Sequence, residues 1–276
     1  MHSTRAGSGG DEDRATDVEV AVAAARAGAL VVRRLYGQRL ARVDKGGGDF
    51  ATATDIEAER AILDVIRAAR PDDAVHGEES GRSGGASAER RWLVDPLCGT
   101  LNYAAGTRVV AVNVALRGGP AAVADPFSGE VFRTDGRTAW ARAAGPLDRG
   151  DEPLAPTSVT RLVDVNLDPP FPNAPGFRAV ELLAHPGFVE RFRPRVVSST
   201  LALAWVAAGR RAAYVTDGGD LADSVHFAAG IALCRAAGCV VTDLDGADID
   251  GADGPGRGLV AAADADTHAE LLSLLA

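Results

Sequence analysis

The sequence predicts a protein of the α/β (α+β) class, and three patterns along its 276 residues indicate this class. Two capping boxes, in which a Ser or Thr is followed three residues later by Glu, open helical segments near the N-terminus. Apolar runs separated by Gly and Pro turns come next, which is typical of an antiparallel meander of strands. Strands and helices alternate in the remainder, as they do in an α/β unit.

Local signals place the first two helices. Thr16–Glu19 is a capping box at the start of an Ala-rich helix that we expect to continue to about Tyr36. Thr54–Glu57 forms a second capping box, and Pro71 ends the helix that it opens, because proline lacks the amide hydrogen that a helix needs. Between the two helices, Lys45–Asp49 is rich in glycine and is predicted to be a loop.

Strands are expected where short apolar runs stand between turns. Residues 72–79 and 91–95 form two such runs, and both end in acidic residues. The meander is expected at 109–117, 121–124, 130–134 and 138–143. In the second half, strands are predicted at 161–166, 195–197, 212–215, 240–243 and 258–263, and helices at 185–192, 201–208, 224–237 and 264–275.

The composition also suggests how the chain is divided. Residues 1–15 are polar and rich in Gly and Ser, so we expect a disordered leader. Residues 16–145 are then an N-terminal α+β half with the antiparallel sheet and the acidic motifs. Residues 146–276 are a C-terminal α/β half, and the polar stretch Gly145–Pro156 is the expected seam between the halves.

Charge and composition exclude several classes of function. Lys and Arg number 29 and Asp and Glu number 38, which gives a net charge of −9 and argues against a nucleic-acid partner. No apolar run approaches the roughly 18–20 residues that span a bilayer, and no export signal is present, so we expect a cytoplasmic protein without membrane contact. Cys98, Cys234 and Cys239 cannot all pair within one chain, and we interpret them as free thiols.

The acidic strand ends are the first candidates for chemistry. Glu78 and Asp95 each follow a predicted strand, and two carboxylates at neighbouring strand ends can converge on a hard divalent cation such as Mg²⁺. The alternative is that Asp95 caps the following turn and Glu78 is simply solvated. Gly99 and Thr100 lie in a turn whose exposed amides would suit a phosphate group.

Four stretches together resemble the motifs of the inositol monophosphatase family of metal-dependent sugar phosphatases. They are Asp49-Phe-Ala-Thr-Ala-Thr-Asp55, Gly77-Glu-Glu-Ser80, Trp92 to Tyr103 with its Asp-Pro-Leu-Cys-Gly-Thr core, and Ala228-Ala-Gly230 through Gly238. They stand in the order and at the spacing of the family, from about residue 16 to the C-terminus. The resemblance implies a layered sandwich of two sheets with flanking helices, a site between the halves, and a homodimer.

The resemblance also implies an activity and its residues. The activity would be metal-dependent hydrolysis of a phosphomonoester of a small polyol, sugar or nucleotide. Glu78, Asp95 and the main-chain carbonyl of Leu97 would hold Mg²⁺. Thr100, supported by Asp55, would orient the attacking water.

Substrate contacts are implied in the same way. The amides of Gly99 and Thr100 would hold the phosphate group. Asp217 lies in the loop with which the family contacts its sugar, and it would recognise hydroxyl groups; a solvated acidic loop is the alternative.

Two positions that bind metal in the family depart from its pattern. Cys98 and His226 both stand where the family has Asp, and both of those carboxylates bind the second catalytic metal in the family. The second site would therefore consist of Asp95, Cys98 and His226. Thiolate and imidazole suit Zn²⁺ or another transition metal better than Mg²⁺.

Three interpretations of these substitutions follow. The second site has changed its metal, or it has lost the metal and most of the activity, or Cys98 and His226 act as a nucleophile and base in a different reaction. The alternative to a phosphatase is thus a family member without that activity. Such a protein would bind a phosphorylated ligand or carry out new chemistry through Cys98 and His226.

Overall fold

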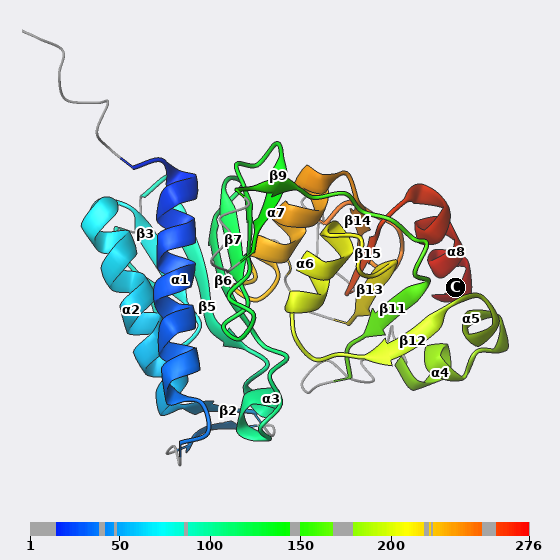
Figure 1. Cartoon of the computed structure of the whole chain (residues 1–276), viewed down its shortest axis with the longest axis horizontal. Coiled ribbons are helices and arrows are strands. Elements are labelled where there is room, and N and C mark those ends of the chain that lie inside the picture. Colours follow the sequence, from blue (N-terminus) through cyan, green and yellow to red (C-terminus); the bar gives the residue numbers. More distant parts are fainter. Residues whose placement is uncertain are drawn as a thin grey trace, which may run out of the picture.

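The computed structural model describes residues 15–38, 42–46, 49–85, 88–143, 150–167, 179–217, 221, 223–249 and 258–275. Within these residues the chain forms a layered sandwich in which helices alternate with two large sheets (Figure 1), as the α/β (α+β) prediction requires. The expected leader at 1–15 lies outside the described residues except for Ala15. The division of the chain at residue 146 stays a prediction, and the short strand β10 (Glu152–Pro153) continues the first large sheet beyond it.

The helices differ widely in length. The two long N-terminal helices are α1 (Asp17–Leu35) and α2 (Ala53–Ala69). The others are α3 (Thr100–Ala104), α4 (Ala179–Ala184), α5 (Pro186–Arg191), α6 (Leu201–Ala207), α7 (Ala228–Ala237) and α8 (Ala265–Leu275).

The first large sheet is mostly antiparallel, with strand order β10-β9-β8-β7-β6-β5-β3-β4. Among its described strands only the neighbours β3 and β5 run parallel, so both end at the same edge. Its strands besides β10 are β3 (Ala74–Gly77), β4 (Gly81–Ser83), β5 (Arg91–Cys98), β6 (Ala111–Leu116), β7 (Ala121–Ala124), β8 (Val131–Thr134) and β9 (Ala139–Arg142).

The second sheet is mixed, with strand order β12-β11-β13-β15-β14. Its strands are β11 (Leu162–Val165), β12 (Arg193–Val196), β13 (Ala213–Thr216), β14 (Val240–Thr242) and β15 (Leu259–Ala262). A separate hairpin pairs β1 (Arg42–Gly46) with β2 (Asp49–Thr52).

Among the described residues, three apolar clusters hold the layers together. Helices α1 and α2 cover the outer face of the first sheet, α6 and α7 lie between the two sheets, and α5 and α8 cover the far side of the second sheet (Figure 1). Burial of apolar surface on both faces of each sheet supplies the main driving force for folding.

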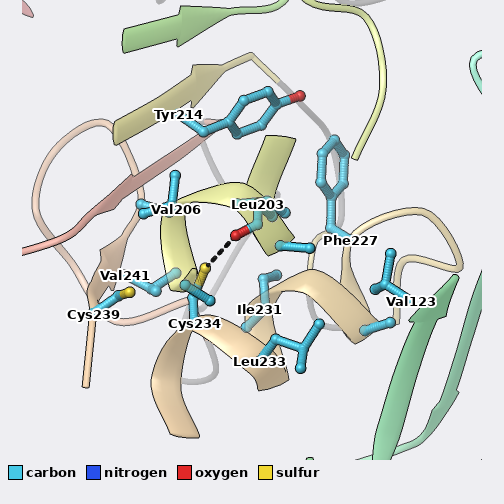
Figure 2. Close-up of a cluster of buried hydrophobic side chains, with 14 of the residues drawn as sticks. Val123, Leu203, Val206, Tyr214, Phe227, Ile231, Leu233, Cys234, Cys239 and Val241 are labelled. Carbon is cyan, nitrogen blue, oxygen red and sulfur yellow. Dashed lines mark hydrogen bonds between the residues drawn. The ribbon is translucent and has the colours of Figure 1, made fainter. Parts of the chain in front are cut away.

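The middle layer depends on close contact between α6 and α7. A Cβ at Gly230 would lie 2.6 Å from the side chain of Leu203, so only glycine allows this approach. Figure 2 shows the same cluster, in which the Cys234 thiol donates to the Leu203 carbonyl at 3.3 Å. Cys234 and Cys239 are both buried and free, as expected.

One predicted cap is confirmed and the other is wrong by two residues. Thr16 and Glu19 form the predicted capping box of α1. Helix α2 instead begins after Thr52, and Asp55 takes the place expected for Glu57. Asp55 accepts from the Thr52 amide at 2.7 Å, whereas Glu57 lies at the surface and pairs with Arg34.

Three further elements differ from the expected ones. The loop predicted at 45–49 is the tip of the β1–β2 hairpin, with residues 47–48 outside the described part. Strand β5 continues past Asp95 to Cys98. Helix α7 begins at Ala228 rather than at Ser224, because Ser224 accepts from the amide of Phe227 and so forms a turn first. None of the helices in the described part of the chain is both long and apolar enough to cross a bilayer.

Candidate functional site

The site is built around Asp95, which is fully buried near the end of β5. The pairing of β5 with β6 shifts register between Asp95 and Cys98. Pro96 lies in this irregularity, and it has no amide hydrogen to donate to the neighbouring strand. The main chain therefore turns back on the side chain, and the Leu97 amide donates to Asp95 Oδ1 at 3.1 Å.

Glu78 comes next to Asp95 because β3 and β5 are parallel neighbours. Gly77, the last residue of β3, lies opposite Val94 of β5. The Glu78 amide continues this pairing and donates to the Val94 carbonyl at 3.0 Å. Two strand ends thus place two carboxylates at one edge of the sheet, as the sequence predicted.

His226 reaches the same point from the turn before α7. Its Nδ1 lies 2.8 Å from Asp95 Oδ2. One ligand atom from each of Glu78, Asp95 and His226 lies within 4.8 Å of the others. Three distant segments of the chain therefore bring two carboxylates and an imidazole together.

The turn that carries His226 is tied to the first sheet. Asp223, three residues earlier, forms ion pairs with Arg117 and, at 3.6 Å, with Arg91. Arg91 begins β5 and Arg117 follows β6, so both arginines belong to the sheet that also carries Asp95. These pairs join the C-terminal segment to the start of β5, at the other end of the strand from Asp95.

Cys98 lies close by but makes a different contact. Its sulfur accepts from the Thr200 amide at 3.2 Å, at the start of α6. Burial and the neighbouring Asp95 raise the pKa of the Cys98 thiol well above its usual value, although the Thr200 amide opposes this shift. In the part of the chain that the structure describes, the group able to hold a metal does not include Cys98. A role for Cys98 as a ligand stays a prediction.

Thr100 and Asp55 contact each other directly. The Thr100 hydroxyl lies 3.0 Å from Asp55 Oδ1 and 3.1 Å from the Leu97 carbonyl, so it donates to one of the two. The other Asp55 oxygen accepts from the Thr52 hydroxyl at 2.5 Å. Burial raises the pKa of Asp55 above its usual value. The two residues predicted to orient water are therefore held together, and the predicted role of the Leu97 carbonyl stays untested.

Gly99 begins the short helix α3 in the left-handed region, with a φ of 101°. A Cβ there would lie 3.0 Å from the Val109 carbonyl, so both conformation and space require glycine. Phosphate binding by the amides of Gly99 and Thr100 stays a prediction. So does sugar recognition by Asp217, which is buried at the end of β13 beside residues 218–220 outside the described part.

Asn113 is a site residue that the sequence analysis missed. It is fully buried on β6 opposite Asp95, and its Nδ2 donates to the Thr200 hydroxyl at 2.8 Å. The same nitrogen lies 3.4 Å from Asp95 Oδ2. A single amide inside the otherwise apolar run 109–116 was the available signal, because buried polar groups need partners.

Comparisons with known proteins agree on one family. A sequence model described as "Inositol monophosphatase family" matches residues 13–276. Inositol-1-monophosphatase ImpA of Mycolicibacterium smegmatis is 36% identical over 241 residues, covering 83% of this chain and 82% of that protein. Nus factor SuhB of Vibrio cholerae is 31% identical over 237 residues, covering 83% and 85%. The crystal structure of extragenic suppressor protein suhB from Bartonella henselae superimposes with a TM-score of 0.78 at 27% identity, covering 93% of this chain and 96% of that one.

We predict that no thiol of the native protein reacts quickly with iodoacetamide. The Cys98 sulfur is engaged by the Thr200 amide and its pKa is raised, while Cys234 and Cys239 are buried. The measurement is the time course of alkylation by mass spectrometry, with guanidinium-unfolded protein as the control in which all three thiols react. Fast alkylation of one thiol that is lost in Cys98→Ser would contradict this and would favour a nucleophilic cysteine.

Proposed function

The chain belongs to the inositol monophosphatase family, and we propose that it is a divalent-metal-dependent phosphomonoesterase acting on a small polyol or sugar phosphate. The observation that carries the proposal is the grouping of Glu78, Asp95 and His226 within 4.8 Å of one another. One member of this group, Asp95, lies five residues before Thr100, whose hydroxyl contacts Asp55 at 3.0 Å. Metal ligands and a water-orienting pair would thus face one site.

The donor set fits one divalent ion. Two carboxylates and one imidazole are typical ligands of Mn²⁺, Fe²⁺ and Zn²⁺, and three protein ligands leave positions open for water and substrate. Imidazole is a poorer ligand for Mg²⁺, which prefers oxygen. We therefore propose a single transition-metal ion held by Glu78, Asp95 and His226, in place of the separate sites expected from the resemblance. Binding would replace the contact between His226 Nδ1 and Asp95 Oδ2.

The proposed ion would supply Lewis acidity to a phosphoryl oxygen and to nearby water. The other tasks fall to the chain itself. When the Thr100 hydroxyl donates to Asp55, its lone pairs are free to accept from a water molecule and so to direct that water at phosphorus. The amides of Gly99 and Thr100 would bind the phosphate oxygens, and the left-handed Gly99 holds the turn in that orientation.

A second candidate is a protein that binds a phosphorylated ligand and hydrolyses it slowly or not at all. The observation that favours it is the position of Cys98, whose sulfur accepts from the Thr200 amide instead of joining the three ligands. By resemblance, a second ion would stabilise the leaving oxygen of the ester. Without that ion the barrier rises by several kcal/mol, on the scale of charge stabilisation that one catalytic ion provides.

We predict that the protein, once a chelator has removed its metal, hydrolyses sugar or polyol phosphates only after Mn²⁺ is added. Glu78→Gln is expected to lower kcat/KM by roughly 10²–10³-fold, because loss of a ligand removes several kcal/mol of charge stabilisation. The measurement is phosphate release from a panel of esters with Mn²⁺, Zn²⁺ and Mg²⁺ added in turn. Asp72→Asn, at an exposed position, is the control and should behave as the unmodified protein. Equal activity of Glu78→Gln would contradict the assignment of this ligand.

The double variant Cys98→Asp/His226→Asp tests which candidate holds. It restores both carboxylates of the family pattern, so we expect it to hydrolyse better with Mg²⁺ than the unmodified protein does, because Mg²⁺ prefers oxygen ligands. The single variants Cys98→Asp and His226→Asp are the controls, and they show which of the two positions accounts for the change in activity. If the double variant is active with Mg²⁺ while the unmodified protein is inactive with every ion, the phosphatase proposal is wrong. The second candidate, a protein that binds a phosphorylated ligand without hydrolysing it, is then supported.

A further inference from the structure

Glu59 is a buried carboxylate with no role in the site as described above. It lies on α2, and only 3% of its surface is exposed. Its Oε2 accepts from the Glu79 amide at 2.7 Å, and its Oε1 accepts from the Ser80 amide at 2.8 Å. Both oxygens are therefore bound to the main chain of the turn that follows β3.

Gly77 fits closely against the same carboxylate. A Cβ at this position would lie 2.6 Å from Cδ and Oε2 of Glu59 and 2.7 Å from Oε1. Gly77 is outside the left-handed region, so glycine is required here for space and not for conformation. The main chain of residues 77–80 thus lies directly on the carboxylate, with Glu78 in its middle.

Glu78 is consequently fixed from two sides. Its amide donates to the Val94 carbonyl at 3.0 Å, which ties it to β5, the strand that carries Asp95. The next two amides donate to Glu59, which ties the turn to α2. The position of the Glu78 carboxylate relative to Asp95 depends on both attachments, because one holds the turn to β5 and the other holds it to α2.

Asp55 and Glu59 lie four residues apart, so they occupy one face of α2. Asp55 binds the Thr100 hydroxyl, and Glu59 binds the turn that carries Glu78. We infer that Glu59 is a positioning residue for the proposed metal site, holding Glu78 toward Asp95 through the main chain of residues 77–80. This inference rests on the proposed function, and it makes α2 the common support of the water-orienting pair and of one metal ligand.

A carboxylate suits this task better than an amide does. The amides of Glu79 and Ser80 are two donors that need two acceptors, and an ionised carboxylate offers two oxygens. A glutamine would offer one oxygen and turn its NH₂ group toward the second donor. The shape of the side chain would be kept, but one buried amide would lose its partner and the turn would shift.

The experiment compares Glu59→Gln with Glu57→Gln. Glu57 lies on the same helix, is partly exposed and pairs with Arg34 at the surface, so it is a matched control. Mn²⁺ binding is measured on the folded proteins by calorimetry and by the electron paramagnetic resonance signal of free Mn²⁺. Glu59→Gln is expected to raise the Kd for Mn²⁺ about 10- to 100-fold, the usual effect of losing an outer hydrogen bond at a metal site. Glu57→Gln should leave the Kd unchanged.

The outcomes separate this inference from the proposed function. If the unmodified protein binds no divalent ion, the proposed function fails and the inference fails with it. If the unmodified protein binds Mn²⁺ and Glu59→Gln binds it equally well, only the role of Glu59 is overturned. Should Glu59→Gln not fold, Gly77→Ala carries the same test, since the added Cβ would displace the same carboxylate. An unchanged Kd in folded Gly77→Ala would then overturn the inference.

Discussion

The site depends on one buried carboxylate, Asp95, which has no exposed surface. A charge in this environment is costly unless it is bound by donors or a cation. Its Oδ1 accepts from the Leu97 amide at 3.1 Å, and its Oδ2 lies 2.8 Å from His226 Nδ1. The first contact is possible because the register of β5 shifts after Asp95, and the second comes from the turn before α7. Asp95 therefore connects the first sheet with the C-terminal segment at the proposed metal site.

Glu78 and His226, the two residues grouped with Asp95, are each held in place by contacts that do not involve Asp95. Parallel pairing of β3 with β5 delivers Glu78, and the ion pairs of Asp223 with Arg91 and Arg117 hold the segment that delivers His226. We propose that imidazole at residue 226 sets which ion the site favours, whereas these contacts set where the ligands lie. On this proposal the geometry of the site and its choice of metal are separate properties of the chain.

Local features were predictable from the sequence, and most features that arise from tertiary contacts were not. The cap of α1 at Thr16 follows from residues next to each other in the chain. The cap of α2 was misplaced because Asp55 competes with Glu57, and burial beside Thr100 decides between them. The acidic strand ends Glu78 and Asp95 were identified correctly as neighbours, since strand ends meet at sheet edges. The contact of Cys98 with the Thr200 amide joins residues about a hundred positions apart, and no sequence pattern indicates it.

The most direct test of the central claim is an anomalous difference map from crystals soaked in Mn²⁺ and measured at the manganese absorption edge. One ion bound by the carboxylates of Glu78 and Asp95 and by the imidazole of His226, with the Cys98 sulfur outside its coordination sphere, is the result that our account predicts. An ion bound through Cys98, an ion that His226 does not contact, or no ion at this site would contradict it.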